Sequence, residues 1–363
     1  MATGGRPGGE PGKRRPTSKD VAAAAGVSRS AVSFAFNDPA RISEATRERI
    51  LAAARELGYV PNAVARMLQA GQTKSLGVLL PQNVAKVMEN PYYARFLLGV
   101  GQVCDREGFT LLLTPPLRDS MLKAIPYAAV DGFVVCGLET DRGEVEELRR
   151  RGIPFVLVDS DAAEGAPSVD VDDRNGAREA VEHLLQLGHR RIAVLSIDPG
   201  PTVATVGYRG SLSRRMAGIA EGLSGAGMTM NDVELLEVPC TRAEGYRATG
   251  AVMAGRAPTA ILALSDVLAI GAVDALHELG LRVPGDVSVT GFDDLPEASW
   301  LRPRLTTVHQ PIAAKGRLAA ELLVSAVRGE DQHPHQVLGT ALMVRDSSGR
   351  APAPGGTGTR TRR

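Results

Sequence analysis

Short apolar runs alternate with amphipathic helical stretches along most of the chain. The apolar runs are four or five residues long and lie at Leu76–Leu80, Thr110–Leu113, Gly132–Val135, Phe155–Val158, Ile192–Leu195, Ala260–Leu264 and Val287–Thr290. Stretches with helical spacing separate most of them, at Tyr93–Glu107, Ala177–Leu187, Arg215–Ala226 and Val267–Leu279. Alternating strands and helices form parallel sheets with helices on both faces. About 270 residues of this pattern exceed one core, so we expect an α/β body of two doubly wound parallel-sheet lobes.

Residues 17–60 have a different pattern, which predicts an all-α unit. Thr17 or Ser18 can cap a first helix, Gly26 supplies the positive φ of a sharp turn, Ser28 caps a second helix and Ser43 begins a third. We expect these helices at Lys19–Ala25, Arg29–Asn37 and from Ser43 to Leu57. Two short helices joined by a tight glycine turn, with a third supporting them, make a helix-turn-helix unit.

The composition of the chain also suggests its domain boundaries. Residues 1–16 and 347–363 are rich in Gly, Pro and Arg, which predicts a disordered basic leader and a disordered tail. Residues 61–72 form a short hinge segment and residues 73–346 the body. We expect one lobe over about 73–188 and 311–337, and the other over about 189–310 and 338–346. The chain would cross between them near Gly188-His189 and Val308–Pro311.

The formal net charge of +1 conceals a strong asymmetry along the chain. Residues 1–72 hold 11 Lys and Arg against 6 Asp and Glu, the tail from residue 347 carries +4, and the rest carries −8. A basic head on an acidic body indicates a polyanionic partner at one end of the molecule. A solvated basic leader would explain Lys13 to Arg15, but not the organised helical pattern that follows.

Composition also bears on the compartment. No apolar run approaches the roughly 20 residues that cross a bilayer, and the N-terminus lacks the apolar stretch of a secretory signal. The three cysteines, Cys104, Cys136 and Cys240, are odd in number and far apart, which argues against a disulfide framework or a structural zinc site. We therefore expect a cytoplasmic protein without a metal or cofactor, acting at the nucleoid.

Seven blocks of sequence follow one another along the chain in a specific order and spacing. The first is residues 18–37 (Ser-Lys-Asp-Val-Ala-Ala-Ala-Ala-Gly-Val-Ser-Arg-Ser-Ala-Val-Ser-Phe-Ala-Phe-Asn), and the others are Thr46–Ile50, Leu57–Arg66, Thr73–Val78, His183–Ile192, Gly291–Asp294 and Leu305–Val308. Together they resemble the LacI/GalR family of transcriptional regulators, whose DNA-binding head the first block matches. The resemblance covers roughly residues 17–346. It implies a three-helix head, a hinge helix, a body like the periplasmic sugar-binding proteins, and a homodimer that reads pseudo-palindromic operator DNA.

The resemblance assigns DNA contacts to the head. Arg29 and Ser30 match the two main base-reading positions, where arginine can bind guanine bidentately and serine reads weakly. Phe34 departs from the Arg or Lys of many relatives and would contact a thymine methyl or simply pack. The plain alternative for Arg29 is an exposed helix charge. The full set is Ser18, Ser28, Arg29, Ser30, Ala31, Ser33, Phe34, Asn37, Tyr59, Asn62, Ala65 and Leu68.

The segment from Pro61 to Ala70 matches the hinge helix of the family. Pro61 presets a first helical turn and Gly71 ends the segment after fewer than three turns, so the helix would be marginal in water. Leu68 matches the leucine that enters the minor groove and opens the central base step. The alternative is that Leu68 belongs to an ordinary core.

The resemblance also implies an effector site between the lobes. Its positions are Tyr92, Tyr93, Asn175, Arg209, Ser211, Arg215, Cys240, Ser265 and Asp293. Arg215 and Asp293 would face each other across the cleft and clamp a hydroxylated ligand, although such a pair could instead be an ion pair that bridges the lobes. Cys240 stands where relatives have a stacking aromatic residue and Ser265 where they have Asn, so the ligand need not be a typical hexose.

These observations predict a sequence-specific DNA-binding regulator, expected to be a repressor, that a small polar effector such as a sugar controls. The alternative is a solute-binding protein of a transport system, against which the intact head and missing signal argue. An enzyme is disfavoured: Gly99-Val100-Gly101 lies within a predicted helix, and no nucleophile elbow, zinc spacing or Walker loop occurs. His333-Pro334-His335 is expected to be an ordinary loop. The family includes both inducible and corepressor-dependent members, so both modes stay open.

Overall fold

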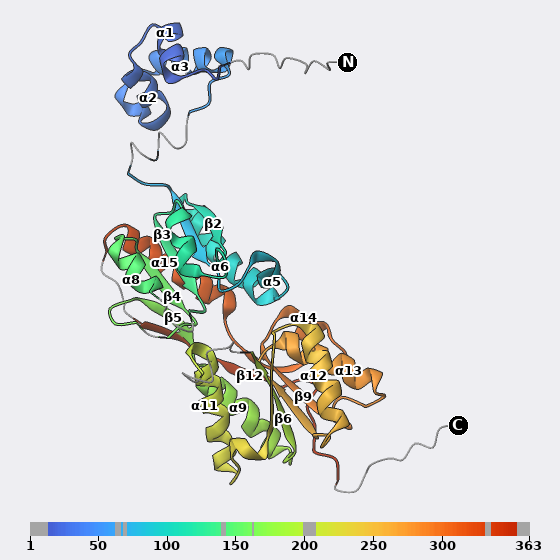
Figure 1. Ribbon diagram of the computed structural model, residues 1–363. Coiled ribbons are helices and arrows are strands. Elements are labelled where there is room, and N and C mark those ends of the chain that lie inside the picture. The colour runs from blue at the N-terminus through green and yellow to red at the C-terminus, as the bar shows by residue number, and fades with distance from the viewer. Residues whose placement is uncertain are drawn as a thin grey trace, which may run out of the picture. The chain divides into compact units, whose positions relative to one another are not determined.

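The computed structural model describes residues 14–61, 67, 71–138, 143–161, 163–198, 208–330 and 335–353. They belong to two compact units, a head that ends at Thr73 and a body that begins at Lys74 (Figure 1). The head contains α1 (Ser18–Ala25), α2 (Arg29–Asn37), the short 3-10 helix η1 (Pro39–Arg41) and α3 (Glu44–Leu57). Among the described residues, no helix combines the length and the apolar character that crossing a membrane requires.

Local capping explains where the helices of the head begin and end. Thr17, not Ser18, caps α1: its backbone N–H and hydroxyl both donate to the Asp20 carboxylate, at 2.8 and 2.7 Å. Gly26 ends α1 with φ 62°, and Ser28 caps α2 by accepting from the Ala31 N–H at 3.1 Å. The apolar faces of the three helices then meet in one small core, formed by Val21, Ala22, Ala25, Val32, Ala35, Ile50, Ala53 and Ala54. The predicted helix-turn-helix unit is confirmed.

The first lobe of the body is built on a six-stranded parallel sheet with the order β11-β5-β4-β3-β1-β2. Its strands are β1 (Ser75–Leu79), β2 (Thr110–Thr114), β3 (Gly132–Cys136), β4 (Phe155–Val158), β5 (Ser168–Val171) and β11 (His335–Leu338). Its helices are α5 (Val84–Met88), α6 (Pro91–Glu107), α7 (Met121–Ala124), η2 (Ile125–Tyr127), α8 (Glu144–Arg150) and α15 (Ile312–Val327). Helices α6 and α15 pack closely because Gly99 has no side chain. A Cβ at this position would lie only 1.9 Å from the Ala313 carbonyl oxygen.

The second lobe repeats this plan with the order β12-β10-β9-β8-β6-β7, in which only β12 runs antiparallel to its neighbour. Its strands are β6 (Ile192–Ile197), β7 (Glu234–Val238), β8 (Ala260–Ala263), β9 (Ser288–Asp293), β10 (Thr306–His309) and β12 (Ala341–Met343). Its helices are α9 (Asp173–Gln186), α11 (Gly210–Gly225), η3 (Met230–Asp232), α12 (Arg242–Ala254), α13 (Asp266–Glu278) and α14 (Pro296–Trp300). The predicted pair of parallel-sheet lobes is therefore confirmed.

The first crossing between the lobes lies earlier than the sequence suggested. The lobe boundary expected near Gly188 is wrong, because α9 already packs in the second lobe, where Val181 and Leu184 share a core with Val194 and Leu262. The chain crosses at Asp172, the residue that caps α9. The second crossing, between β10 and α15, falls where it was predicted, and a third joins β11 to β12.

The prediction that a disordered tail begins at residue 347 is also wrong. Ser347 is fully buried, and its hydroxyl donates to the Val289 carbonyl at 2.6 Å. The Gly349 carbonyl lies 3.0 Å from the His189 ring nitrogen Nε2, and the Ala351 N–H donates to the Leu187 carbonyl at 2.9 Å. Small polar residues such as these can run beside a strand when its backbone groups provide partners, so residues 347–353 belong to the second lobe. Residues 354–363 lie outside the described part of the chain.

Candidate functional site

The N-terminal turn of α2 presents polar side chains at the surface of the head. Arg29 and Ser30 are exposed, and neither makes a side-chain hydrogen bond or ion pair with another described residue. Ser28 is occupied as the N-cap of the same helix. A charged guanidinium and a hydroxyl at an exposed helix start are suited to an external polar partner, such as a base edge.

The other predicted DNA-contact positions of the head are partly engaged within it. Phe34 is half-buried, with the Arg41 guanidinium 5.2 Å from its ring centre. Asn37 donates to the Ser33 hydroxyl at 3.3 Å. Tyr59 packs against the core beside Phe36, with ring centres 5.9 Å apart.

Ser18 and Ala31 are also half-buried in their helices. Of the remaining predicted contacts, Asn62, Ala65 and Leu68 lie outside the described residues. The hinge assignment therefore remains a prediction.

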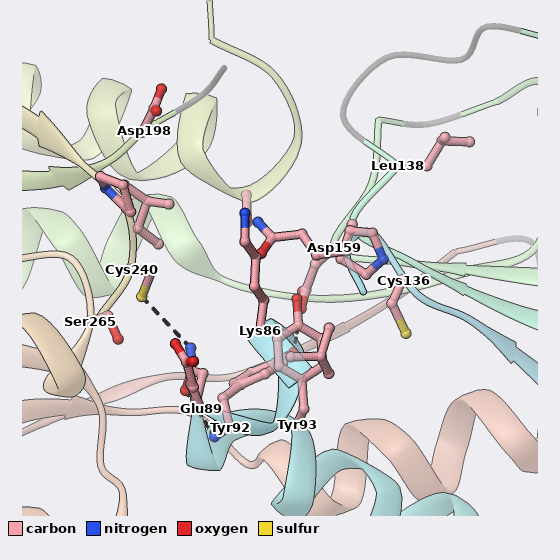
Figure 2. Close-up of a pocket in the computed structure, with 18 of the residues that line it drawn as sticks. Lys86, Glu89, Tyr92, Tyr93, Cys136, Leu138, Asp159, Asp198, Cys240 and Ser265 are labelled. Carbon is pink, nitrogen blue, oxygen red and sulfur yellow. Dashed lines mark hydrogen bonds between the residues drawn. The ribbon is translucent and has the colours of Figure 1, made fainter. Parts of the chain in front are cut away.

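A cleft of about 610 Å³ lies in the body and is lined by both lobes. Figure 2 shows Cys240, Ser265 and Asp198 of the second lobe on one side and Asp159 of the first lobe on the other, with Tyr92 at the base. Seven of the nine predicted effector residues line this cleft: Tyr92, Tyr93, Ser211, Arg215, Cys240, Ser265 and Asp293. Most of them follow the carboxyl ends of strands or begin a helix, as is usual for ligand sites of open α/β sheets.

The other two predicted residues, Asn175 and Arg209, do not line the cleft. Asn175 lies in the first turn of α9 and is held by its own helix, since it donates to Glu179 at 2.9 Å and accepts from Arg178 at 2.5 Å. Arg209 is exposed and forms an ion pair with Asp161 of the first lobe at 3.5 Å. Both side chains are directed to partners outside the cleft. The prediction that Asn175 and Arg209 line the cleft is therefore corrected.

Arg215 is the buried cation of the second-lobe wall. From α11, its Nε donates to the Asp173 carboxylate at 2.8 Å and its Nη1 to the Leu264 carbonyl at 2.7 Å. The guanidinium also stacks over the Phe292 ring at 3.7 Å. Burial would lower its pKa, but Asp173 and then Asp293 raise it, so the group stays protonated. Its Nη2 has no hydrogen-bond partner among the described residues and remains for a ligand.

Asp293, at the end of β9, is the acidic counterpart on the same wall. Its carboxylate accepts from Ser265 at 3.0 Å and from Gln310 at 2.6 Å. Its φ of 130° is a strained conformation of the kind found at functional sites, and burial raises its pKa. Arg215 and Asp293 both belong to the second lobe, so the prediction that they face each other across the cleft is wrong, and the first lobe contributes other groups.

The first lobe contributes a buried network that sequence reasoning missed. Lys315 has no exposed surface, and its Nζ lies 2.8 and 2.7 Å from the two carboxylate oxygens of Asp159 and 2.9 Å from Gln310 Oε1. The Tyr92 hydroxyl donates to the same Asp159 carboxylate. Because Gln310 also donates to Asp293, a continuous chain of polar groups joins the lobes. We call Tyr92, Asp159, Lys315, Gln310 and Asp293 the interlobe relay.

The relay has consequences for protonation at the cleft. Burial would raise the pKa of Asp159, but the nearby Lys315 lowers it below its usual value. Burial and the Asp159 charge raise the pKa of Tyr92, so its phenol stays protonated and donates. Burial raises the pKa of Cys240 to about 11, which keeps its thiol neutral. That thiol accepts from Asn90 of the first lobe at 3.6 Å, and Figure 2 shows this contact as the dashed line that starts at the labelled Cys240.

One signal in the sequence could have revealed Lys315. It occupies the buried face of α15 with Ile312, Ala319 and Leu323, at helical spacing. A lysine on an otherwise apolar helix face needs a buried carboxylate as its partner. Asp159, directly after the buried strand β4, was a candidate for that role. Among the described residues, no group of His, Cys, Asp and Glu side chains could hold a metal ion.

A helix-turn-helix head joined to a two-lobed body with a polar interlobe cleft defines the class of ligand-responsive DNA-binding regulators. Comparison with known proteins agrees. Residues 17–62 match the family model "Bacterial regulatory proteins, lacI family" and residues 181–348 match "Periplasmic binding protein-like domain".

Among curated relatives, the HTH-type transcriptional regulator CelR of Thermobifida fusca is 36% identical over 347 residues, which are 92% of this chain and 99% of CelR. The HTH-type transcriptional repressor PurR of Haemophilus influenzae (strain PittEE) is 31% identical, over 88% of this chain and 94% of PurR. The chain therefore belongs to the lacI family of bacterial regulatory proteins.

Solved structures show the same architecture. A complex of the transcriptional regulator CelR with cellobiose has a TM-score of 0.66 at 33% identity, covering 92% of this chain and 100% of that one. The lac repressor dimer bound to operator and an anti-inducer has a TM-score of 0.77 at 26% identity, covering 93% and 100%. The relatives named here are regulators, which favours regulation over solute transport or catalysis.

Proposed function

We propose that the protein is a cytoplasmic transcriptional repressor that binds a pseudo-palindromic operator as a homodimer and releases or retains it according to a small polar ligand in the cleft. The observation that carries this proposal is the combination, in one chain, of an exposed Arg29 at the start of α2, with no partner among the described residues, and a polar cleft lined by two lobes. A solute-binding protein does not need a DNA-contacting residue such as Arg29. A DNA-binding protein without a ligand does not need a polar cleft between two lobes.

For DNA recognition, Arg29 and Ser30 are the proposed base-reading residues. Arginine can donate two hydrogen bonds to one guanine, which fixes a base at one position of each half-site. Ser30 tolerates several bases, so the neighbouring position should be less selective. Leu68 is proposed to insert into the minor groove at the centre of the operator, where a flexible pyrimidine–purine step lowers the cost of the kink.

For the ligand, a saccharide is the proposed class. The cleft offers carboxylate acceptors in Asp159 and Asp293 and a free guanidinium nitrogen on Arg215, a set suited to hydroxyl groups. Tyr93 adds an aromatic wall. The complex of the similar CelR with cellobiose supports this class and makes cellobiose the first ligand to test.

The proposed switch is a change in lobe closure. Residues from both lobes line the cleft, so a ligand that binds one closure state better shifts the protein toward that state. Closure in a dimer would change the separation of the two hinge segments, and with it their fit to one minor groove. Coupling of this kind is typically about 1–3 kcal/mol.

The test begins with genome-wide mapping of the DNA that the protein binds, which yields the operator motif. Fluorescence anisotropy with that operator then measures affinity while cellobiose and other saccharides are titrated. An inverted repeat with a ligand-dependent affinity is the expected result. A single unsymmetrical half-site bound by a monomer, or an operator affinity that no saccharide changes, would contradict the proposal.

A further inference from the structure

Both buried cations at the cleft are already neutralised by carboxylates of the chain itself. Lys315 is held between the two carboxylate oxygens of Asp159, at 2.8 and 2.7 Å. Arg215, whose relative exposure is 7%, is paired at 2.8 Å with Asp173, which has no exposed surface. Neither cation therefore brings an uncompensated positive charge to a ligand.

The remaining charges around the cleft are mostly negative. The basic residues that line it are Lys86 and Arg215, and the acidic ones are Glu89, Asp119, Glu144, Asp159, Asp198 and Asp293. Glu89 and Asp119 are exposed, and neither forms an ion pair with another described residue. The described residues thus supply an excess of negative charge to the cleft.

We propose that the cleft selects uncharged, hydroxyl-rich ligands and excludes those that carry a phosphate or carboxylate, and that the Lys315–Asp159 pair is a determinant of this selectivity. The inference rests on the proposed function of the cleft as the effector site. Hydroxyl groups can donate to Asp159 and Asp293 and accept from Arg215. The phosphate group of a sugar phosphate is mostly a dianion at neutral pH, and it would meet like charges in a partly dehydrated site, where repulsion is weakly screened.

The role of Lys315 in this selectivity is to hold Asp159 in place, ionised and facing the cleft. An apolar side chain would fill the same helix position without the cost of burying an ammonium group. Lys315 is therefore a positioning residue that acts on ligands through Asp159. If the pair served the packing of the lobe alone, replacing it would change stability and leave ligand preference as it was.

The experiment uses the full-length protein and matched neutral and anionic probes. Calorimetry at low salt compares cellobiose with cellobiose 6′-phosphate, and glucose with glucose 6-phosphate, while thermal unfolding follows stabilisation by inorganic phosphate. We expect the neutral member of a pair to bind about tenfold tighter or more, and phosphate to give no stabilisation. An anionic member that binds as tightly as its neutral partner would overturn the proposal.

The Asp159→Asn variant tests the pair directly. It removes a negative charge from the cleft lining and leaves the Lys315 charge behind it without its carboxylate, so we expect phosphate to stabilise this variant and the preference for neutral sugars to fall about fivefold or more. Replacing both residues, with Lys315→Met and Asp159→Asn, removes the freed cation and should abolish the gain. Equal anion binding by the wild type and Asp159→Asn would refute the role of the pair.

Asp161→Asn is the matched control, because Asp161 lies in the same loop and carries the same charge but pairs with Arg209 outside the cleft. We expect it to leave anion binding unchanged. If Asp159→Asn does not fold, Asp293→Asn carries the test, since it removes a carboxylate from the opposite wall and should also raise anion affinity. Failure of the proposed function would look different: operator binding that no ligand changes, whatever the anion measurements show.

Discussion

The two sites of this protein carry charge in opposite ways. In the head, Arg29 and Ser30 are exposed and have no partner among the described residues. At the cleft, Arg215 and Asp293 of the lining and Lys315 behind it are buried, and each is held by at least two hydrogen bonds within the chain. The head leaves its recognition groups for an external partner to order, whereas the cleft orders them before a ligand arrives.

This difference predicts how substitutions behave. A change at Arg29 or Ser30 should act locally, because the replaced side chain has no partner among the described residues to disturb. A change in the cleft should act on several groups at once, because the members of the interlobe relay share hydrogen bonds. The four predictions that follow test this contrast, from the largest expected effect to the smallest.

Lys315→Met should lower the free energy of unfolding by about 3 kcal/mol, because it leaves the partly buried Asp159 carboxylate without its cation. Adding Asp159→Asn should restore most of that loss, since the double variant has no uncompensated charge. Urea denaturation of both variants measures the effect. A double variant no more stable than the single one would show that the two residues are not coupled.

Asp293→Ala should weaken cellobiose binding by about 2–3 kcal/mol, because a buried charged acceptor is lost. Operator affinity without ligand should remain near that of the wild type, since the substitution is in the body and not in the head. Calorimetry and anisotropy separate the two effects. An operator affinity that falls in the absence of ligand would mean that the substitution by itself shifts the closure of the unliganded lobes.

Arg29→Ala should cost about 1–3 kcal/mol of operator affinity and relax selection at one base pair of each half-site, without changing stability. Arg29→Lys is the control, because it keeps the charge but loses the bidentate geometry. Anisotropy with operators altered at single positions gives the selectivity. If Lys restores the affinity and the selectivity in full, Arg29 contacts phosphate only.

Asp170→Asn should change how stability depends on pH. Asp170 lies where β5 meets the second lobe and pairs with Arg214 at 2.7 Å, yet burial raises its pKa from 3.8 to about 6. An acid whose pKa is higher in the folded state loses stability as pH rises, here between about 4 and 6. Relative to the wild type, the variant should gain about 1–3 kcal/mol across that window, because one unit of pKa difference corresponds to about 1.4 kcal/mol. Thermal unfolding at pH 4 and pH 7 measures the gain, and no change between them would contradict it.

The sequence revealed the elements whose apolar pattern is strong. Strands such as β1 and β8 are buried throughout and appear as continuous apolar runs. The edge strand β7 has alternating exposure, and β11 and β12 are short edge strands with little burial, so their sequences contain no clear signal.

For the site, the resemblance identified single residues that line the cleft, such as Arg215 and Asp293, but it did not identify which residues contact one another. It could not show that α9 joins the second lobe, because the apolar residues of this helix have the same spacing along the sequence whichever sheet they cover. Nor could it show the interlobe relay, whose members Asp159 and Lys315 are 156 positions apart. Such pairs form only when the sheet brings strand ends together.

The hydrogen bonds of residues 347–353 determine where this protein can be shortened or extended. Cutting the chain after residue 346 would eliminate two hydrogen bonds: that from the Ser347 hydroxyl to the Val289 carbonyl, and that between His189 Nε2 and the Gly349 carbonyl. A body made for ligand-binding measurements should therefore run to Ala353. An affinity tag or a fluorescent reporter should be fused beyond that residue, where it leaves the backbone pairing beside β9 intact.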